Sequence, residues 1–302
     1  MKKNQRIVIT GGSGFIGSAL IDALLRKGYR NLLTISKDRR GSRVHVKQFV
    51  SLMEDEARLR KILQPDDTVI HLAWSTTPAS AEANPRKDRA ENIGGTRALL
   101  NACAAKNVRF FIFASSGGTV YGTAHRPLRE TTAPRPIGSY GKTKRAAEQL
   151  IERYAKKSGT PCAIVRIGNP YGRADVKGRL QGAVDVFLEK IVHGTPIDIW
   201  GDGSVVRDYI HVEDVAGLFV RVIEKNLTGI YNAATGVGTT LNALIRIIEK
   251  TTGKKARVSY TLGRAIDLPY NVLAIGKAKK EGWKPRYELQ AGIRKTFDAL
   301  YK

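Results

Sequence analysis

The sequence predicts an α/β fold, in which a doubly wound parallel sheet carries a smaller, partly interwoven C-terminal lobe. Three observations support this prediction. A β-branched run at residues 6–10 leads into glycines spaced three apart and then into an amphipathic segment, the order expected for strand, turn and helix. Apolar runs and amphipathic segments alternate from there to about residue 170. Beyond that point the elements become shorter and are separated by Gly and Pro.

Residues 1–170 are predicted to form the sheet and the helices that cover it. Strands rich in Ile, Val, Leu or Phe are expected at 6–10, 31–36, 68–73, 109–114 and 162–167. Helices are expected between them at about 14–27, 55–63, 87–106 and 140–157. The remaining residues, 171–302, are predicted to form the smaller lobe, and the boundary between the two parts is soft.

The turn after the first strand contains Gly11, Gly14 and Gly17. Glycine permits a tight turn and lets the backbone approach a ligand closely, while the N–H groups and dipole of the following helix attract anions. A glycine pattern between a strand and a helix therefore predicts a site for the diphosphate of a dinucleotide. The alternative is an ordinary tight turn between a strand and a helix.

The chain is strongly basic, with 51 Lys and Arg against 27 Asp and Glu and a net charge of +24. Phosphate neutralisation makes nucleic acid one candidate partner. The basic residues are scattered along the whole chain, however, and they are not interleaved with aromatic side chains. This distribution favours a basic surface with a few arginines that serve a small anionic substrate.

The 302 residues can bury a sizeable core, and their apolar runs are too short for a transmembrane helix. The basic start is followed by only a few apolar residues before the glycines, so no signal peptide is expected. Cys103 and Cys162 are predicted to be small apolar packing residues, and nothing indicates a metal site or a disulfide. The simplest expectation is a cytoplasmic protein.

Tyr140 and Lys144 lie four residues apart, on one face of a predicted helix. A lysine ammonium beside a phenol stabilises the phenolate and lowers a pKa that is ordinarily about 10. Such a tyrosine can exchange a proton with a sugar hydroxyl while the sugar is oxidised or reduced. The spacing alone is weak evidence, because a chain with many lysines will contain such pairs by chance.

Nearly the whole chain resembles an extended short-chain dehydrogenase/reductase of the NAD(P)-dependent nucleotide-sugar epimerase/dehydratase family, which includes the UDP-glucose 4-epimerases. The glycines match the glycine loop of that family, and Tyr140 and Lys144 match its catalytic YxxxK. Trp74 replaces the last alanine of its DxVIHLAA strand. The other resembling segments are DTVIHLA at 67–73, NIGGT at 92–96, SSGGTVYG at 115–122, RIGNPYG at 166–172 and RDYIHVED at 207–214.

The resemblance implies a Rossmann fold, a bound nicotinamide cofactor and a nucleotide-sugar substrate. Tyr140 would be the acid/base, and Lys144 would hold the nicotinamide ribose. Asn169 would contact the substrate near its diphosphate, which Arg207 and Arg264 would clamp with their guanidinium groups; the alternative for each arginine is a solvated surface charge. The cofactor would be bound by Gly11, Gly14, Phe15, Ile16, Gly17, Ser36, Lys37, Arg39, Met53, Leu72, Ala73, Asn92, Ser115, Tyr140 and Lys144.

The chain departs from the family pattern at Gly117, where the family places a catalytic Ser or Thr. Thr119 has the same strand parity and is the first candidate to supply that hydroxyl, and Ser116 is the second. Alternatively, Tyr140 acts alone. The Asp-Glu pair of the dehydratases is replaced by Gly118 and Thr119, so 4,6-dehydration is not expected.

A second departure concerns the cofactor. The acid that ordinarily binds the adenosine ribose of NAD at the end of the second strand is replaced by Ser36. Lys37, Arg39 and Arg40 could meet a 2′-phosphate, which favours NADP over NAD. Asp38 could still support NAD if the strand ends two residues later.

Three functions are compatible with these residues. The first, which we predict, is 4-epimerisation of a UDP-hexose through a transient 4-keto sugar. The second is NADPH-dependent reduction of a nucleotide-linked 4-keto-6-deoxy sugar, which the basic cluster and Gly117 favour. The third is a non-catalytic dinucleotide- or RNA-binding protein. A homodimer would pair the helices at 87–106 and 140–157, although packing on the sheet explains their apolar stripe equally well.

Overall fold

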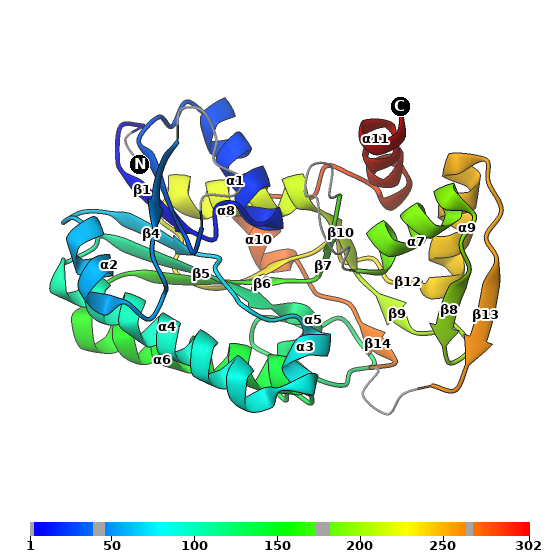
Figure 1. Cartoon of the computed structure of the whole chain (residues 1–302), viewed down its shortest axis with the longest axis horizontal. Helices are drawn as coiled ribbons and strands as arrows, with labels where there is room; N and C mark the ends of the chain where they lie inside the picture. The colour runs from blue at the N-terminus through cyan, green and yellow to red at the C-terminus, as the bar shows by residue number, and fades with distance from the viewer. Residues whose placement is uncertain (1–2, 39–45, 173–181, 264–267) are drawn as a thin grey trace.

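A seven-stranded parallel sheet forms the centre of the molecule (Figure 1), in the order β11-β6-β5-β4-β1-β2-β3. The computed structural model describes residues 3–38, 46–172, 182–263 and 268–302. All neighbouring strands of the sheet run parallel. The strands are β1 (Ile7–Thr10), β2 (Leu32–Ser36), β3 (Lys47–Val50), β4 (Thr68–His71), β5 (Phe110–Ser116), β6 (Cys162–Ile167) and β11 (Gly229–Ala233). The predicted doubly wound fold is confirmed.

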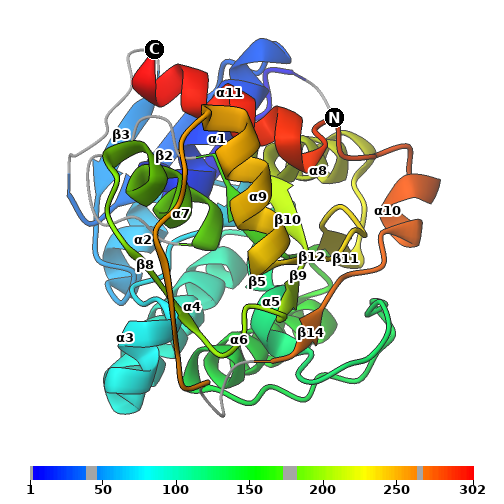
Figure 2. The same cartoon turned by 90° about the vertical axis from the view of Figure 1, so that its right-hand side faces the viewer.

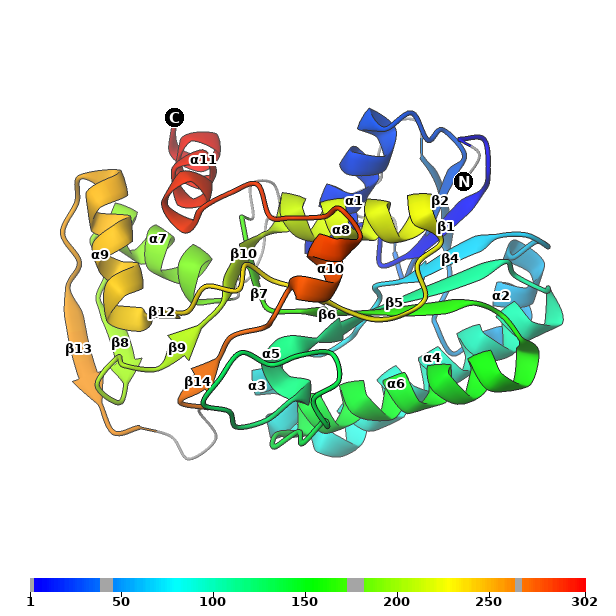
Figure 3. The same cartoon turned by 180° about the vertical axis from the view of Figure 1, so that it is seen from behind.

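Helices cover both faces of the sheet (Figure 3). One face carries α1 (Phe15–Arg26) and α8 (Val212–Lys225), which contact each other, and α10 (Gly276–Lys280) contacts β11. The other face carries α2 (Glu56–Ile62), α4 (Pro85–Ala105) and α6 (Ser139–Ser158), of which α4 contacts both α2 and α6. Because both faces are covered, the inner strands are almost continuously apolar, as in Phe110–Phe113 of β5, where every side chain is buried.

The strands and helices predicted for the first 170 residues are all present, with ends shifted by a few residues. The elements of the sheet and its covering helices that were not predicted are β3, α8, α10 and β11. The short helices α3 (Pro78–Ala83) and α5 (Gly117–Val120) were also not predicted. Since α8 and β11 both lie beyond residue 170, the chain returns to the sheet after it has begun the second lobe.

The second lobe lies beyond the carboxyl ends of the central strands (Figure 1), and Figure 2 shows it from its outer side. It has an apolar core cluster of its own. Its helices are α7 (Ala183–His193), α9 (Leu241–Thr252) and α11 (Leu289–Tyr301). Three small sheets complete it: β7 (Asn169–Tyr171) with β10 (Tyr209–His211), β8 (Ile197–Trp200) with β13 (Val258–Thr261), and β9 (Val206–Arg207) between β12 (Thr239–Thr240) and β14 (Tyr270–Asn271).

The apolar stripe of α4 is used within the chain. Ile93, Ala98, Leu99 and Ala102 are buried in a core cluster together with residues of the sheet and of α6. A homodimer through α4 and α6 would therefore depend on other side chains and stays a prediction. No helix in the described ranges has the length and apolar character needed to cross a membrane.

Candidate functional site

The turn between β1 and α1 is a backbone cradle that only glycine permits. Gly11 has a φ of +70°, and a β-carbon there would lie 2.8 Å from the Ala73 nitrogen. A β-carbon on Gly17 would overlap the Gly11 carbonyl oxygen. Gly14 is the N-cap of α1 and provides no side-chain acceptor for the first N–H groups of the helix. The cradle therefore fits a diphosphate, which would accept those hydrogen bonds.

The end of β2 presents no carboxylate at the position that ordinarily binds the adenosine ribose. Ser36 is buried, and its hydroxyl lies 3.4 Å from the hydroxyl of Ser13 in the glycine turn. Lys37 is exposed directly after it. Arg39, the next predicted residue, lies outside the described residues. Met53 packs beside Gly95 of α4, the helix that also carries Asn92.

His71 at the end of β4 is a structural residue. Thr96 Oγ1 donates to the Asn92 carbonyl oxygen at 2.7 Å, so its contact of 3.1 Å with His71 Nε2 requires a proton on that nitrogen. Thr10 Oγ1 then donates to Nδ1 at 2.8 Å. Burial, helped by the charge of Lys144, lowers the pKa of His71 to about 3. His71 is therefore neutral and fully hydrogen-bonded.

Two residues predicted to contact the cofactor use their side chains elsewhere. The Asn92 amide accepts from the Ser75 backbone N–H at 2.9 Å and donates to Thr76 Oγ1 at 3.1 Å, which fixes the loop after β4. Ser115 Oγ donates to the Glu148 carboxylate at 2.6 Å. The Ser115 hydroxyl therefore has only its acceptor capacity left for a ligand. The chain at Leu72 and Ala73 is held by Thr10, through hydrogen bonds of 3.2 Å from each backbone N–H.

Tyr140 and Lys144 lie in the first turns of α6, beside the loop that follows β4. The backbone N–H of Ser139 at the start of the helix donates to the Glu82 carboxylate. Lys144 is buried, and its Nζ donates to the Ala114 carbonyl oxygen at 2.9 Å. Nζ also lies 3.6 Å from the centroid of the Trp74 ring and 5.8 Å from that of Tyr140. The Trp74 and Tyr140 rings meet edge to face, with centroids 6.2 Å apart.

The electrostatics of this pair correct the expectation of an acidified phenol. Burial raises the pKa of Tyr140 well above 10, and the charge of Asp88 raises it further. Burial lowers the pKa of Lys144 to about 7, against the opposing charges of Glu148 and Asp88. In the protein alone, Tyr140 is therefore protonated at neutral pH.

The hydroxyl that the family places at position 117 has no room here. A β-carbon on Gly117 would overlap Leu273 Cδ1, and Asn271 Nδ2 donates to the Gly117 carbonyl oxygen at 3.1 Å. Thr119 Oγ1 is buried and lacks a hydrogen-bond partner within the part of the chain that the structure describes. Ser116 Oγ and Asn169 Oδ1 both lie 3.8–3.9 Å from the point where a β-carbon on Gly118 would sit, so they border the same space.

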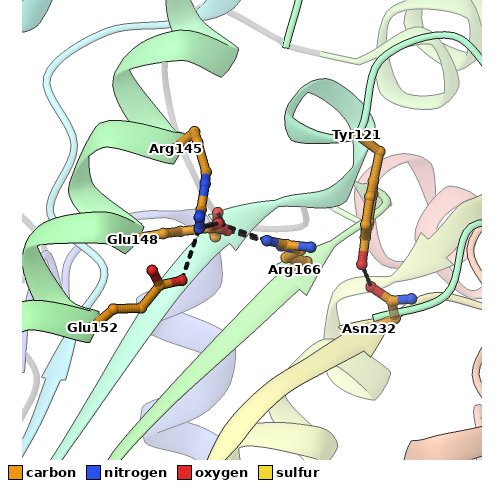
Figure 4. A network of polar contacts seen from close by, with 7 residues as sticks. Tyr121, Arg145, Glu148, Glu152, Arg166 and Asn232 are labelled. Carbon is orange, nitrogen blue, oxygen red and sulfur yellow. Dashed lines mark hydrogen bonds and ion pairs between the residues drawn. The ribbon is translucent and has the colours of Figure 1, made fainter. Parts of the chain in front are cut away.

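A buried ion-pair network holds the carboxyl ends of β5 and β6 against α6 (Figure 4). Arg166 donates to the Glu148 carboxylate from Nε at 2.9 Å and from Nη2 at 2.7 Å, and both residues are almost completely buried. Arg145 donates to the same carboxylate at 3.0 Å. The Arg166 guanidinium also lies 4.6 Å from the centroid of Tyr121, whose hydroxyl donates to Asn232 of β11 at 2.8 Å. The resemblance had marked Arg166 as part of a motif but had given it no role.

Two predicted substrate residues meet in one cavity of about 370 Å³ in the second lobe. Asn169 and Arg207 line it, together with Phe187, Trp200 and Tyr209 among others. Arg207 Nη1 donates to the Leu268 carbonyl oxygen at 2.6 Å. Asn169 thus borders both this cavity and the space beside Ser116. Arg264 lies outside the described residues.

A larger open depression of about 650 Å³ lies at the opposite edge of the sheet, at the amino ends of the strands. It is lined by Arg6, Asp67 and Arg109 among others. Arg6 and Asp67 form an ion pair of 2.7 Å there. Ligands of open parallel sheets bind at the carboxyl ends of the strands, and none of the predicted site residues lies at this depression.

A model of the NAD dependent epimerase/dehydratase family matches residues 7–234, about three quarters of the chain. The chain belongs to this family. It is accordingly an enzyme of the nicotinamide-dependent nucleotide-sugar class, with the Rossmann fold that the sequence predicted.

Relatives of this chain differ in activity. The chain is 32% identical over 307 residues to a UDP-glucose 4-epimerase of Mycolicibacterium smegmatis, covering 97% of this chain and 98% of that protein. It is also 32% identical over 315 residues to a dTDP-4-dehydro-6-deoxyglucose reductase of Escherichia coli, covering 99% and 98%.

Solved structures of family members superpose closely on this chain. The UDP-glucose 4-epimerase of Thermotoga maritima, solved with UDP-glucose, has a TM-score of 0.90 at 32% identity, with 98% of each chain covered. The UDP-glucose 4-epimerase of Thermus thermophilus, solved with NAD, has a TM-score of 0.91 at 31% identity, again with 98% of each chain covered.

Proposed function

We propose that this enzyme interconverts UDP-hexoses that differ in configuration at C4, through a transient 4-keto sugar. The arrangement of Tyr140 carries this proposal. Its ring packs edge to face on Trp74 in the loop that follows β4, and Lys144 Nζ lies 5.8 Å from the ring centroid. A dinucleotide bound at the cradle and a nucleotide sugar bound in the cavity would meet at this phenol.

Tyr140 and Lys144 have different roles in this reaction. When bound, the oxidised nicotinamide supplies a two-electron acceptor and a positive charge. Tyr140 takes the proton of the C4 hydroxyl while C4 is oxidised to a ketone, and later returns the proton to the C4 oxygen. Lys144 holds the nicotinamide ribose and stabilises the phenolate. The pKa of Tyr140 is raised in the protein alone, so its acidification depends on the cations that surround it in the complex.

Epimerisation requires the keto sugar to turn over while the nucleotide stays bound. Arg207 is suited to hold the diphosphate, because a guanidinium group donates two parallel hydrogen bonds to phosphate oxygens. Asn169 supports it from β7, and we propose Arg264 as the second clamp. Thr119, with its unpartnered hydroxyl, is the proposed replacement for the hydroxyl that Gly117 cannot supply, and Ser116 is the second candidate.

The choice between NADP and NAD depends on the end of β2. Ser36 and the exposed cation of Lys37 favour the 2′-phosphate of NADP, whereas the Thermus thermophilus neighbour was solved with NAD. We propose that the chain binds NADP at least as tightly as NAD. Dissociation constants for the two oxidised cofactors, measured by calorimetry on the cofactor-free protein, compare them directly.

Reduction of a nucleotide-linked 4-keto-6-deoxy sugar is the second candidate. Leu273 fills the position of the family's catalytic hydroxyl, and a relative of equal identity is a reductase. In that reaction Tyr140 would donate a proton to the C4 oxygen once, and the reduced cofactor would be consumed.

One set of assays distinguishes the candidates. An epimerase interconverts UDP-glucose and UDP-galactose without added reductant and keeps its cofactor through purification. A reductase consumes NADPH only with the keto sugar. Tyr140→Phe should lower either activity by about 10²–10⁴-fold, the usual contribution of a general acid or base. Tyr154→Phe, on the outer part of the same helix, is the matched control and should retain activity. If Tyr140→Phe stays within about twofold of the wild type, Tyr140 is not the acid/base.

A further inference from the structure

Glu148 is a fully buried carboxylate that lies one helical turn after Lys144 on α6. Residues four apart on a helix are neighbours on its surface, and Lys144 is itself only 4% exposed. The carboxylate accepts hydrogen bonds from Arg166 and Arg145 (Figure 4). Apolar side chains of similar volume often stabilise a protein as well as a buried ion pair does. Stability alone therefore gives no reason for such a pair beside Lys144.

Glu148 and Lys144 are also joined through two adjacent residues of β5. Lys144 Nζ donates to the Ala114 carbonyl oxygen at 2.9 Å, and the Ser115 hydroxyl donates to Glu148 Oε1 at 2.6 Å. The ammonium and the carboxylate thus hold the same end of β5 from the same helix. Because Ser115 is paired with Arg166 across β5 and β6, one carboxylate aligns both strand ends with α6.

The charges around this turn of α6 decide which form of Lys144 is favoured. The charged and titratable residues nearby are His71 on β4, Asp88 on α4, Arg166 on β6, and Tyr140, Arg145 and Glu148 on α6. His71 is neutral, because burial lowers its pKa to about 3. Burial also lowers the pKa of Lys144 to about 7, and Glu148 opposes this lowering more strongly than Asp88 does. Of the groups named, only these two carboxylates favour the ammonium form.

We propose that Glu148 is a positioning residue of the site, which supplies the counter-charge of the Lys144 ammonium and, through Ser115, fixes the end of β5 that receives it. Arg166 holds this carboxylate in place from the neighbouring strand. Glu148 acts through Lys144 and is assigned no contact with a ligand. The consequence for cofactor binding rests on the proposed role of Lys144 in holding the nicotinamide ribose.

The test follows NADH binding by nicotinamide fluorescence from pH 5 to 9, a range in which NADH itself does not titrate. Glu148→Gln keeps the shape and one acceptor but removes the charge. The pKa of Lys144 should then fall, so the pH at which NADH binding weakens should fall by about one unit. Glu152→Gln removes the partly exposed carboxylate that also pairs with Arg145, and it should leave that pH unchanged.

Two further variants separate this role from a structural one. Glu148→Gln leaves Arg166 with an uncompensated buried charge and should lower the thermal midpoint. Arg166→Met also breaks the pair but keeps the charge of Glu148, so the pH dependence of NADH binding should stay unchanged. The double variant should recover most of the thermal midpoint lost in Glu148→Gln and retain its shifted pH dependence. If Glu148→Gln does not fold, the double variant is compared with Arg166→Met.

A second measurement needs no cofactor. The difference in unfolding free energy between Lys144→Met and its parent, followed against pH, reports the ionisation of Lys144. Its midpoint should lie about one unit lower in the double-variant background than in the Arg166→Met background. The proposal is wrong if replacing Glu148 moves neither midpoint, or if Arg166→Met moves them equally. A shifted unfolding midpoint with NADH binding that is independent of pH supports the role of Glu148 and contradicts only the proposed role of Lys144 in cofactor binding.

Discussion

The ammonium nitrogen of Lys144 lies 3.6 Å from the centroid of the Trp74 ring, in van der Waals contact with its face. The resembling family motif has alanine at this position, so the motif itself does not supply this contact. A desolvated cation over an indole face is stabilised by roughly 0.5–2 kcal/mol. Trp74 therefore offsets part of the cost of burying Lys144 and fixes where its charge lies relative to Tyr140.

Replacing Trp74 with Leu should lower the pKa of Lys144 further. Leucine keeps the site apolar but removes the ring face that favours the ammonium form. Because one pKa unit corresponds to about 1.4 kcal/mol, we expect a decrease of about 0.5–1 unit, measured as a shift to lower pH in the loss of cofactor binding. Trp74→Phe keeps an aromatic face and should shift less than half as far. Equal shifts in the two variants would show that the ring face has no electrostatic role.

The buried charge of Lys144 should also be visible in the stability of the protein. Its pKa is about 7 in the folded chain and ordinarily 10.5. Between these values the unfolded chain binds a proton that the folded chain does not, so the cost of burying Lys144 falls as the pH rises above 7. Lys144→Met should therefore raise the free energy of unfolding most at pH 6. This gain in the free energy of unfolding over the wild type should become smaller toward pH 9, by at most about 1.4 kcal/mol per pH unit.

Urea denaturation of both proteins across this range measures the difference. Lys142→Met, on the exposed side of the same helix, is the matched control and should show no such trend. If the difference in the free energy of unfolding between Lys144→Met and the wild type is constant from pH 6 to 9, Lys144 stays charged throughout this range.

Restoring the family's hydroxyl with Gly117→Ser should destabilise the protein instead of improving catalysis. The new β-carbon would overlap Leu273, and overpacking a core position typically costs about 1–3 kcal/mol. Combining it with Leu273→Ala should recover that cost, so the double variant should be more stable than the sum of the two single effects predicts. Thermal and urea denaturation of the wild type, the two single variants and the double variant measure this coupling. Additive effects would contradict the steric conflict.

Much of the fold could be predicted because strong local patterns coincide with buried elements. The β-branched run before Gly11 is fully buried as β1, and the predicted helices match α1, α2, α4 and α6 closely. The edge strand β3 was missed because its sequence, KQFV, is only half apolar and its side chains are only partly buried. The strand β11 was missed because its place in the sheet is decided by pairing with β6, more than 60 residues earlier, which no local pattern reveals.

The candidate site, like the fold, could be predicted only in part. The positions of Gly11, Tyr140, Lys144 and Asn169 followed from motifs, whereas Asp88 did not. Its surroundings in the sequence, PRKDRAEN, read as a solvated helix start. A signal was present, because Asp88, Asn92, Thr96 and Leu99 follow one another at helical spacing and form the buried face of α4. Polar residues on an otherwise buried stripe are uncommon, and this pattern could have drawn attention to Asp88, whose charge acts on Tyr140.

The late position of β11 has a consequence for how the protein is made. Until residue 233 has left the ribosome, the backbone of β6 has bare hydrogen-bonding groups along one side. An exposed strand edge of this kind invites pairing with other nascent chains. Roughly 60 further residues must be synthesised before that edge is sealed, so the nascent chain carries an open strand edge that the finished enzyme does not have.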